Sequence, residues 1–145
     1  MFHANKESIG TICFLTYNRG RRLLNTLEEI LPEIDSNWPI LITNNASTKD
    51  LAAYEKIERI ARSRDDVHYV RHNKNGMFEG NLLSLFELVP TQFMVVISDE
   101  DVPSINGLAE MTDFLRMNRD IGAIRTSLGP PQKPVKQPSQ AITME

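Results

Sequence analysis

Short apolar runs alternate with amphipathic segments along this chain, and this alternation restricts its fold more than any other feature. Each apolar, β-rich run is followed by a segment whose apolar residues recur at helical spacing. The predicted strands cover 9–16, 38–42, 67–71 and 93–97, and the predicted helices cover 20–31, 51–64, 78–89 and 105–115. Four such repeats predict an α/β fold, a three-layer α/β/α sandwich around a mostly parallel, Rossmann-like sheet.

The chain is long enough for one domain with its own core, because it has 145 residues of ordinary globular composition. We expect that domain to span 1–127 and to include a fifth strand at 121–125. Residues 128–145 are rich in proline and glutamine and contain almost no large apolar side chains. This composition predicts an irregular or disordered tail.

Charge and cysteine content exclude several classes of protein. A formal net charge of -3 gives no electrostatic case for nucleic acid as a partner. Cys13 is the single cysteine, so an internal disulfide is excluded, and its apolar neighbours predict a buried side chain. The sequence has neither an apolar stretch of transmembrane length nor a signal-peptide pattern. We therefore expect a cytoplasmic protein, free or peripheral to the inner face of the membrane.

Polar side chains cluster directly after each predicted strand. These clusters cover 16–19, 44–47, 73–75 and 99–101. The carboxyl ends of parallel strands meet at one edge of the sheet, and ligands bind there, near the point where the strand order reverses. The opposite edge has fewer asparagines, hydroxyls and clustered acids, so we expect the ligand site at the carboxyl edge.

The acids Asp99, Glu100 and Asp101 follow the apolar run at 93–97. Three neighbouring carboxylates repel one another, so we expect a divalent cation, or lysines and arginines from elsewhere, beside them. The alternative is a solvated turn in which Asp101 or Ser104 caps the next helix. Because GxxxxGK[ST] and GxGxxG loops are absent, a P-loop enzyme and a dinucleotide dehydrogenase are disfavoured. Paired carboxylates at a strand end suit a diphosphate that is held through a metal ion.

Four ordered segments together resemble glycosyltransferase family 2, whose members have the GT-A fold. They are 11–19 (TICFLTYNR), 42–48 (ITNNAST), Asn75-Gly76 with Gly80-Asn81, and 99–101 (DED). The resemblance implies inverting, metal-dependent transfer of a sugar from a UDP-, dTDP- or GDP-sugar to a glycan or lipid-linked acceptor. It also implies Mg or Mn as the cofactor.

The resemblance assigns roles to individual residues. Asp101, together with Asp99, is the implied metal ligand, and Asn44 takes the place of the family's base-reading aspartate. The implied nucleotide-sugar contacts are Thr16, Tyr17, Asn18, Arg19, Asn44, Ser47, Asn75, Asp99 and Glu100. Ser47 has a second expected role as the cap of the helix at 51–64, because Ser47-x-x-Asp50 has the form of a capping box.

Two departures from the family pattern stand out. Asn44 lacks the charge of the family's aspartate, although its amide oxygen can accept a hydrogen bond from a pyrimidine N–H. Family members also continue past the acids into a half that binds the acceptor and supplies the catalytic base. No residue after Asp113 suits that role, because Asp120 precedes a strand at the wrong edge and Glu145 is terminal. We therefore expect a truncated GT-A sheet that carries mainly the donor-binding half, with no catalytic residue assigned.

Two other functions remain open at this point. The first is a non-catalytic module that binds a nucleotide-sugar or a protein partner with the same fold. The second is a receiver-like domain that uses its acids for Mg and phosphoryl transfer. A receiver would need acids after the first strand as well, and this chain has Thr16-Tyr17-Asn18 there.

Overall fold

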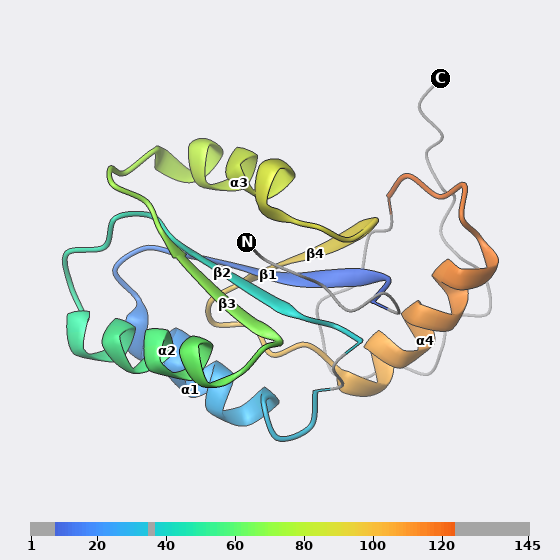
Figure 1. The fold of residues 1–145 in the computed structure, drawn as a ribbon, viewed down its shortest axis with the longest axis horizontal. Helices are drawn as coiled ribbons and strands as arrows, with labels where there is room; N and C mark the ends of the chain where they lie inside the picture. Colours follow the sequence, from blue (N-terminus) through green and yellow to red (C-terminus); the bar gives the residue numbers. More distant parts are fainter. Residues whose placement is uncertain (1–7, 35–36, 124–145) are drawn as a thin grey trace.

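The computed structural model of the chain describes residues 8–34 and 37–123. Four strands alternate with four helices in this part of the chain, as the sequence predicts (Figure 1). The strands are β1 (Gly10–Thr16), β2 (Ile40–Asn44), β3 (Val67–Arg71) and β4 (Phe93–Ser98). The helices are α1 (Gly20–Ile30), α2 (Leu51–Ser63), α3 (Met77–Leu88) and α4 (Ile105–Met117). Of the expected fifth strand, 121–123 is not in a strand, and its remainder lies outside the described residues, as does the expected tail.

The sheet has the order β3-β2-β1-β4, and every pair of neighbouring strands is parallel. The chain therefore builds outward from β1 to β3 and then crosses to the other side of β1 to add β4. Thr16 pairs with Asn44 and Asn44 with Arg71, so the strands end at a common level. The strand order reverses between β1 and β4, which is where ligands bind in open sheets of this kind.

Helices cover both faces of the sheet and produce the predicted three layers (Figure 1). On one face, Ile12 and Phe14 of β1 belong to a core cluster that also contains buried residues of α1, α2 and α4. On the other face, Cys13 packs with Leu41 and with Leu85 of α3. Because successive strand residues point to opposite faces, one apolar strand supplies both halves of the core.

Trp38 fixes the amino end of the sheet. Its ring lies over Gly10, the first residue of β1, and its indole N–H donates to the hydroxyl of Thr112 on α4 at 2.7 Å. This contact ties α4 to the sheet at the edge opposite the polar loops. Within 8–34 and 37–123, no helix has the length and apolar character needed to cross a membrane.

Candidate functional site

The loops after the strands hold unusual backbone conformations at the carboxyl edge. Among the described residues other than glycine, φ is positive at Asn18 (58°), Ala46 (55°), Asp50 (55°) and Met77 (60°). Asn18, Ala46 and Asp50 lie between a strand end and the next helix, and Met77 is the first residue of α3. Positive φ costs such residues roughly 1 to 3 kcal/mol, so the surrounding contacts must impose these conformations, as they do at many ligand sites.

The first and second loops are joined through Asn18 and Ser47. The Asn18 backbone N–H donates to the Ser47 hydroxyl at 2.8 Å. The Asn18 side-chain oxygen accepts the N–H groups of Thr48 at 2.8 Å and Lys49 at 3.0 Å. The structure thus brings together two residues that the sequence placed at the site, and both side chains bind protein groups.

The expectation that Ser47 caps α2 is wrong. Helix α2 begins at Leu51, its N-cap residue is Asp50, and no side chain makes a cap hydrogen bond. The Asp50 carboxylate instead accepts the backbone N–H of Arg21 at 3.3 Å. The positive φ at Asp50 turns the chain just before the helix, so the local capping box does not form.

Asn44 is fully buried, and both ends of its amide have protein partners. Its oxygen accepts the Ser47 N–H at 2.9 Å, and its nitrogen donates to the Tyr69 hydroxyl at 2.6 Å. A base that bound the Asn44 oxygen would have to share or replace the bond from Ser47. Base recognition by Asn44 therefore stays a prediction.

Asn45 connects the second loop to the third. Its amide nitrogen donates to the Asn75 side chain at 3.0 Å and to the Met77 carbonyl at 2.9 Å. Its oxygen accepts the Gly76 N–H at 2.9 Å. The predicted site residue Asn75 therefore lies beside the second loop, and Asn45 is the side chain that holds it there.

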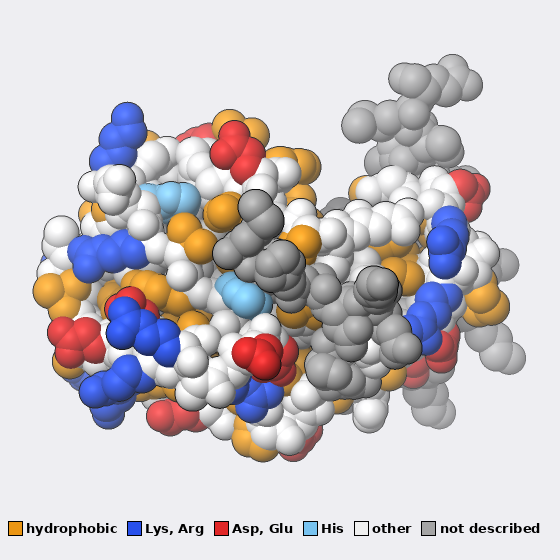
Figure 2. Space-filling model, in the orientation of Figure 1, with side chains coloured by type: hydrophobic (Ala, Val, Ile, Leu, Met, Phe, Trp, Pro, Cys, Tyr) orange, Lys and Arg blue, Asp and Glu red, His pale blue; other side chains and the backbone are white. Residues whose placement is uncertain are grey.

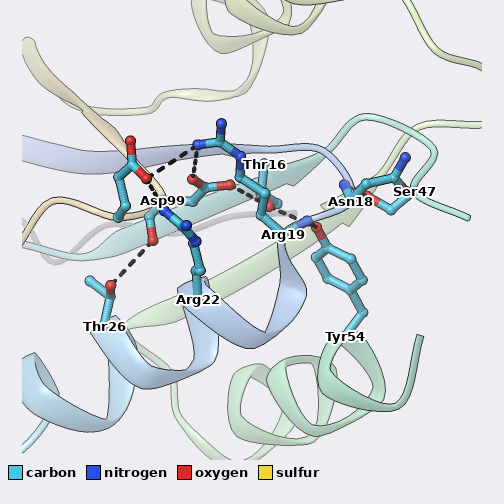
Figure 3. A network of polar contacts seen from close by, with 9 residues as sticks. Thr16, Asn18, Arg19, Arg22, Thr26, Ser47, Tyr54 and Asp99 are labelled. Carbon is cyan, nitrogen blue, oxygen red and sulfur yellow. Dashed lines mark hydrogen bonds and ion pairs between the residues drawn. The ribbon is translucent and has the colours of Figure 1, made fainter. Parts of the chain in front are cut away.

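Asp99 is the buried acid at the centre of the site, and only 3% of it is exposed. One carboxylate oxygen accepts the Thr16 hydroxyl at 3.1 Å, and the other accepts the Arg19 guanidinium at 3.3 Å (Figure 3). Burial raises the pKa of the Asp99 carboxyl above its ordinary value, and the bonds from Thr16 and Arg19 offset part of that rise. The Thr26 hydroxyl donates to the Asp99 backbone carbonyl at 3.2 Å, so α1 also holds this residue.

Two arginines supply the positive charge that the acidic triplet requires. Arg19 lies 3.5 Å from the Glu100 carboxylate, and Arg22 also pairs with Glu100. The Asp101 carboxylate makes no hydrogen bond or ion pair within the described part of the chain. Ser104, and not Asp101, caps α4, because its side chain accepts the Gly107 N–H at 3.1 Å.

An open cavity of about 490 Å³ lies where β1 and β4 end. Tyr17, Arg19, Phe78 and Asp99 are among the residues that line it. The two aromatic side chains are 44% and 63% exposed, respectively, so flat apolar surface lies near a guanidinium and a carboxylate. A second cavity of about 510 Å³ runs along the outer edge of β4 and has no charged residue in its lining. Of these two cavities, only the first has charged residues in its lining.

Several side chains at the site escaped sequence reasoning. Tyr54, Arg22 and Thr26 looked like ordinary helix residues, and Phe78 looked like part of an apolar stripe. Tyr54 was the one polar-tipped aromatic in the stripe of its helix, which is the signal that could have singled it out.

Comparisons with known proteins agree with the fold. The family model described as glycosyl transferase family 2 matches residues 11–140. No curated protein sequence matches the chain.

Solved structures with a similar fold include a mannosyltransferase and the protein TarS. The mannosyltransferase PcManGT from Pyrobaculum calidifontis, in complex with GDP-Man and Mn2+, has a TM-score of 0.62 at 18% identity, over 74% of this chain. S. aureus TarS 1-349 in complex with UDP-GlcNAc has a TM-score of 0.63 at 14% identity, over 88% of this chain. This chain spans 32% of the length of the first and 38% of the second. The predicted GT-A type of α/β fold is therefore confirmed.

Proposed function

Because the chain belongs to glycosyl transferase family 2, we propose that it binds the nucleoside diphosphate of a sugar donor in the cavity between β1 and β4. The observation that carries this proposal is the position of Asp99. A buried carboxylate, held on both oxygens by Thr16 and Arg19, lies where the strand order reverses and lines a cavity of about 490 Å³. A fixed acceptor at that place suits a ribose or another hydroxyl-bearing part of the ligand.

In this proposal, other groups around the cavity bind the base and the diphosphate of the donor. Tyr17 offers an exposed ring to the base, and the guanidinium groups of Arg19 and Arg22 lie near enough to the acids to meet a diphosphate. Figure 2 shows several Lys and Arg side chains on the left of the molecule, the side on which the strands end in Figure 1. Asn18, Asn44, Ser47, Asn75 and Glu100 are proposed to shape the pocket.

A divalent cation, Mg or Mn, fits this site with Asp101 as its ligand. Within 8–34 and 37–123, no three His, Cys, Asp or Glu side chains gather as a complete metal site. Such ions, however, bind one or two carboxylates and take their remaining ligands from phosphates and water. Asp101, whose carboxylate has no partner among the described residues, suits this mode better than Asp99, which already holds Thr16 and Arg19. When bound, the cation would neutralise charge on the leaving diphosphate.

The reaction that we propose is inverting transfer of the sugar to a hydroxyl of a glycan or lipid-linked acceptor. Such a transfer needs a base to take the proton from the acceptor hydroxyl as it attacks the anomeric carbon. Asp99 and Glu100 are paired with arginines, and Asp101 is proposed as the metal ligand, so we assign the role of this base to none of the three acids. We therefore propose that this chain contributes the donor-binding part of a transferase.

Calorimetry with UDP, GDP and dTDP, each with and without Mn2+, tests the proposal. Wild type should bind at least one nucleotide with Mn2+, and Asp101→Ala should weaken that binding about tenfold or more, as expected for a lost charge-assisted ligand. Asp113→Ala is the matched control, because it removes the same charge from an exposed position on α4. The absence of binding by every nucleotide at millimolar concentration would refute the proposal. Binding without transfer or donor hydrolysis would favour the non-catalytic binding module.

A further inference from the structure

Tyr54 belongs to the core of the molecule, yet its hydroxyl reaches the site. The residue lies on α2 and is 3% exposed, among the apolar residues of the larger core cluster. Its hydroxyl is 2.7 Å from the Thr16 hydroxyl and accepts the Arg19 backbone N–H at 3.1 Å (Figure 3). One hydroxyl group therefore contacts the end of β1 and the residue that precedes α1.

Thr16 and Arg19 are the two residues that hold the Asp99 carboxylate. Thr16 binds one of its oxygens and Arg19 binds the other. The Tyr54 hydroxyl is hydrogen-bonded to both of these residues, and within the described part of the chain it makes no hydrogen bond to Asp99. The tyrosine on α2 is thus linked to the acid after β4 by way of the end of β1 and its loop, although these three segments are distant in the sequence.

The hydrogen bonds can run in only one direction. A backbone N–H only donates and an ionised carboxylate only accepts. The Tyr54 hydroxyl must therefore accept a hydrogen bond from Arg19 and donate one to the Thr16 hydroxyl. The Thr16 hydroxyl must in turn donate to the Asp99 carboxylate. This direction leaves Asp99 with a donor on each oxygen, and it fixes the Thr16 hydroxyl, which could otherwise rotate.

The tyrosine ring is held firmly enough to fix the position of its hydroxyl. A Cβ atom added to Gly20 would lie 2.9 Å from the ring, so α1 begins in direct contact with it. The Thr16 side chain is buried as well, and only 1% of the residue is exposed. Thr16 can therefore affect a ligand more readily through Asp99 than by direct contact.

We infer that Tyr54 is a positioning residue for the nucleotide site, acting through Thr16 and Arg19 on Asp99. This inference rests on the proposed function, because Asp99 is taken to contact the bound nucleotide sugar. Side chains that orient a ligand-binding group from behind typically change affinity about tenfold or more when they are removed. Loss of the hydroxyl should leave the fold intact and weaken ligand binding.

The test compares nucleotide affinity across four variants, measured by calorimetry with UDP, GDP and dTDP in the presence of Mn2+. Tyr54→Phe should weaken binding about tenfold, the equivalent of one lost hydrogen bond. Thr16→Val should weaken it at least as much, and Thr16→Ser, which keeps the hydroxyl, should bind within about twofold of wild type. Adding Tyr54→Phe to Thr16→Val should cause a smaller loss than Tyr54→Phe causes in wild type, because the path through Thr16 is already removed and only the contact with Arg19 is left.

Thr112→Val is the matched control for a merely structural effect. Thr112 is also a buried threonine, and its hydroxyl also lies 2.7 Å from an aromatic side chain, that of Trp38, at the opposite edge of the sheet. Its substitution should lower thermal stability and leave nucleotide affinity unchanged. Amide exchange supplies a readout without ligand, because the Arg19 N–H should exchange faster in Tyr54→Phe than in wild type.

The outcomes separate the inference from the proposed function. If wild type binds no nucleotide, the proposed function fails and the positioning role fails with it. If wild type binds and Tyr54→Phe binds equally well, only the positioning role fails. Equal affinity losses in Tyr54→Phe and Thr112→Val, or unchanged exchange at Arg19, would also overturn it.

Discussion

The same substitution, glycine to alanine, should have opposite effects on stability at Gly10 and at Gly80. A Cβ atom at Gly10 would lie 2.3 Å and 2.7 Å from two ring carbons of Trp38. Trp38 cannot easily move away, because it is 3% exposed and its indole N–H is bound to Thr112 at 2.7 Å. Overpacking of this kind costs about 1–3 kcal/mol.

Gly80 provides the opposite case. It is exposed within α3, and an added Cβ would meet no atom within 4 Å other than those of its chain neighbours and of the backbone of its own helix. Alanine there should stabilise the fold by about 1 kcal/mol, because glycine is a poor helix former and alanine the best.

Urea denaturation measures both effects, and the single tryptophan of the chain reports unfolding by fluorescence. With an m value of about 2 kcal/mol/M, Gly10→Ala should lower the urea midpoint by roughly 0.5–1.5 M, and Gly80→Ala should raise it by roughly 0.5 M. A Gly10→Ala midpoint equal to that of wild type would refute the packing argument at Trp38. Shifts of both variants in the same direction would refute the contrast between the two sites.

Two further predictions concern titratable groups. Burial raises the pKa of Cys13 to about 12. A thiol reagent at pH 8 should therefore modify Cys13 only when the chain unfolds. Modification of Cys13 faster than global unfolding would contradict its burial. The Arg64 guanidinium donates to the Asp66 carboxylate at 2.9 Å and 2.8 Å and holds the pKa of Asp66 below its usual value of 3.8. The resulting stability, up to about 1 kcal/mol for this partly exposed pair, is fully present above that value and is lost as the pH falls from it through the lower pKa of the folded state. Asp66→Asn should therefore be less stable than wild type at pH 7, with a difference that shrinks below about pH 4; a difference independent of pH would argue against the ion pair.

The order and type of the elements could be predicted because they depend on local patterns. The apolar run at 10–16 forms a strand buried on both faces, and helical stripes such as that of Leu23 and Leu27 pack on the sheet. The run at 93–97 also forms a strand, but it lies at the edge of the sheet and is only partly buried. The chemistry of the site could be predicted in part for the same reason, since polar residues after parallel strands must share one edge. The expectation of arginines or a cation near the acids followed from repulsion, and Arg19 and Arg22 are the arginines found there.

Local patterns failed where a side chain had a choice of partners. Ser47 has the spacing of a helix cap, but its hydroxyl binds the Asn18 N–H in another loop. The amide of Asn44 likewise has two partners inside the protein, and its contact with a base stays a prediction. In each case a group distant in the sequence competes with the local or ligand partner, and sequence spacing does not show which one prevails.

The sequence by itself determined the alternation of elements, the apolar faces and the edge at which polar side chains gather, because these follow from residue periodicity and from the geometry of parallel strands. Only the tertiary structure decided which of those side chains hold one another. Thr16 and Asp99 are 83 residues apart, and Thr16 and Tyr54 are 38 apart. A hydrogen bond forms only within about 3.5 Å, and such proximity between distant residues is set by the strand order and the packing of α2 against α1.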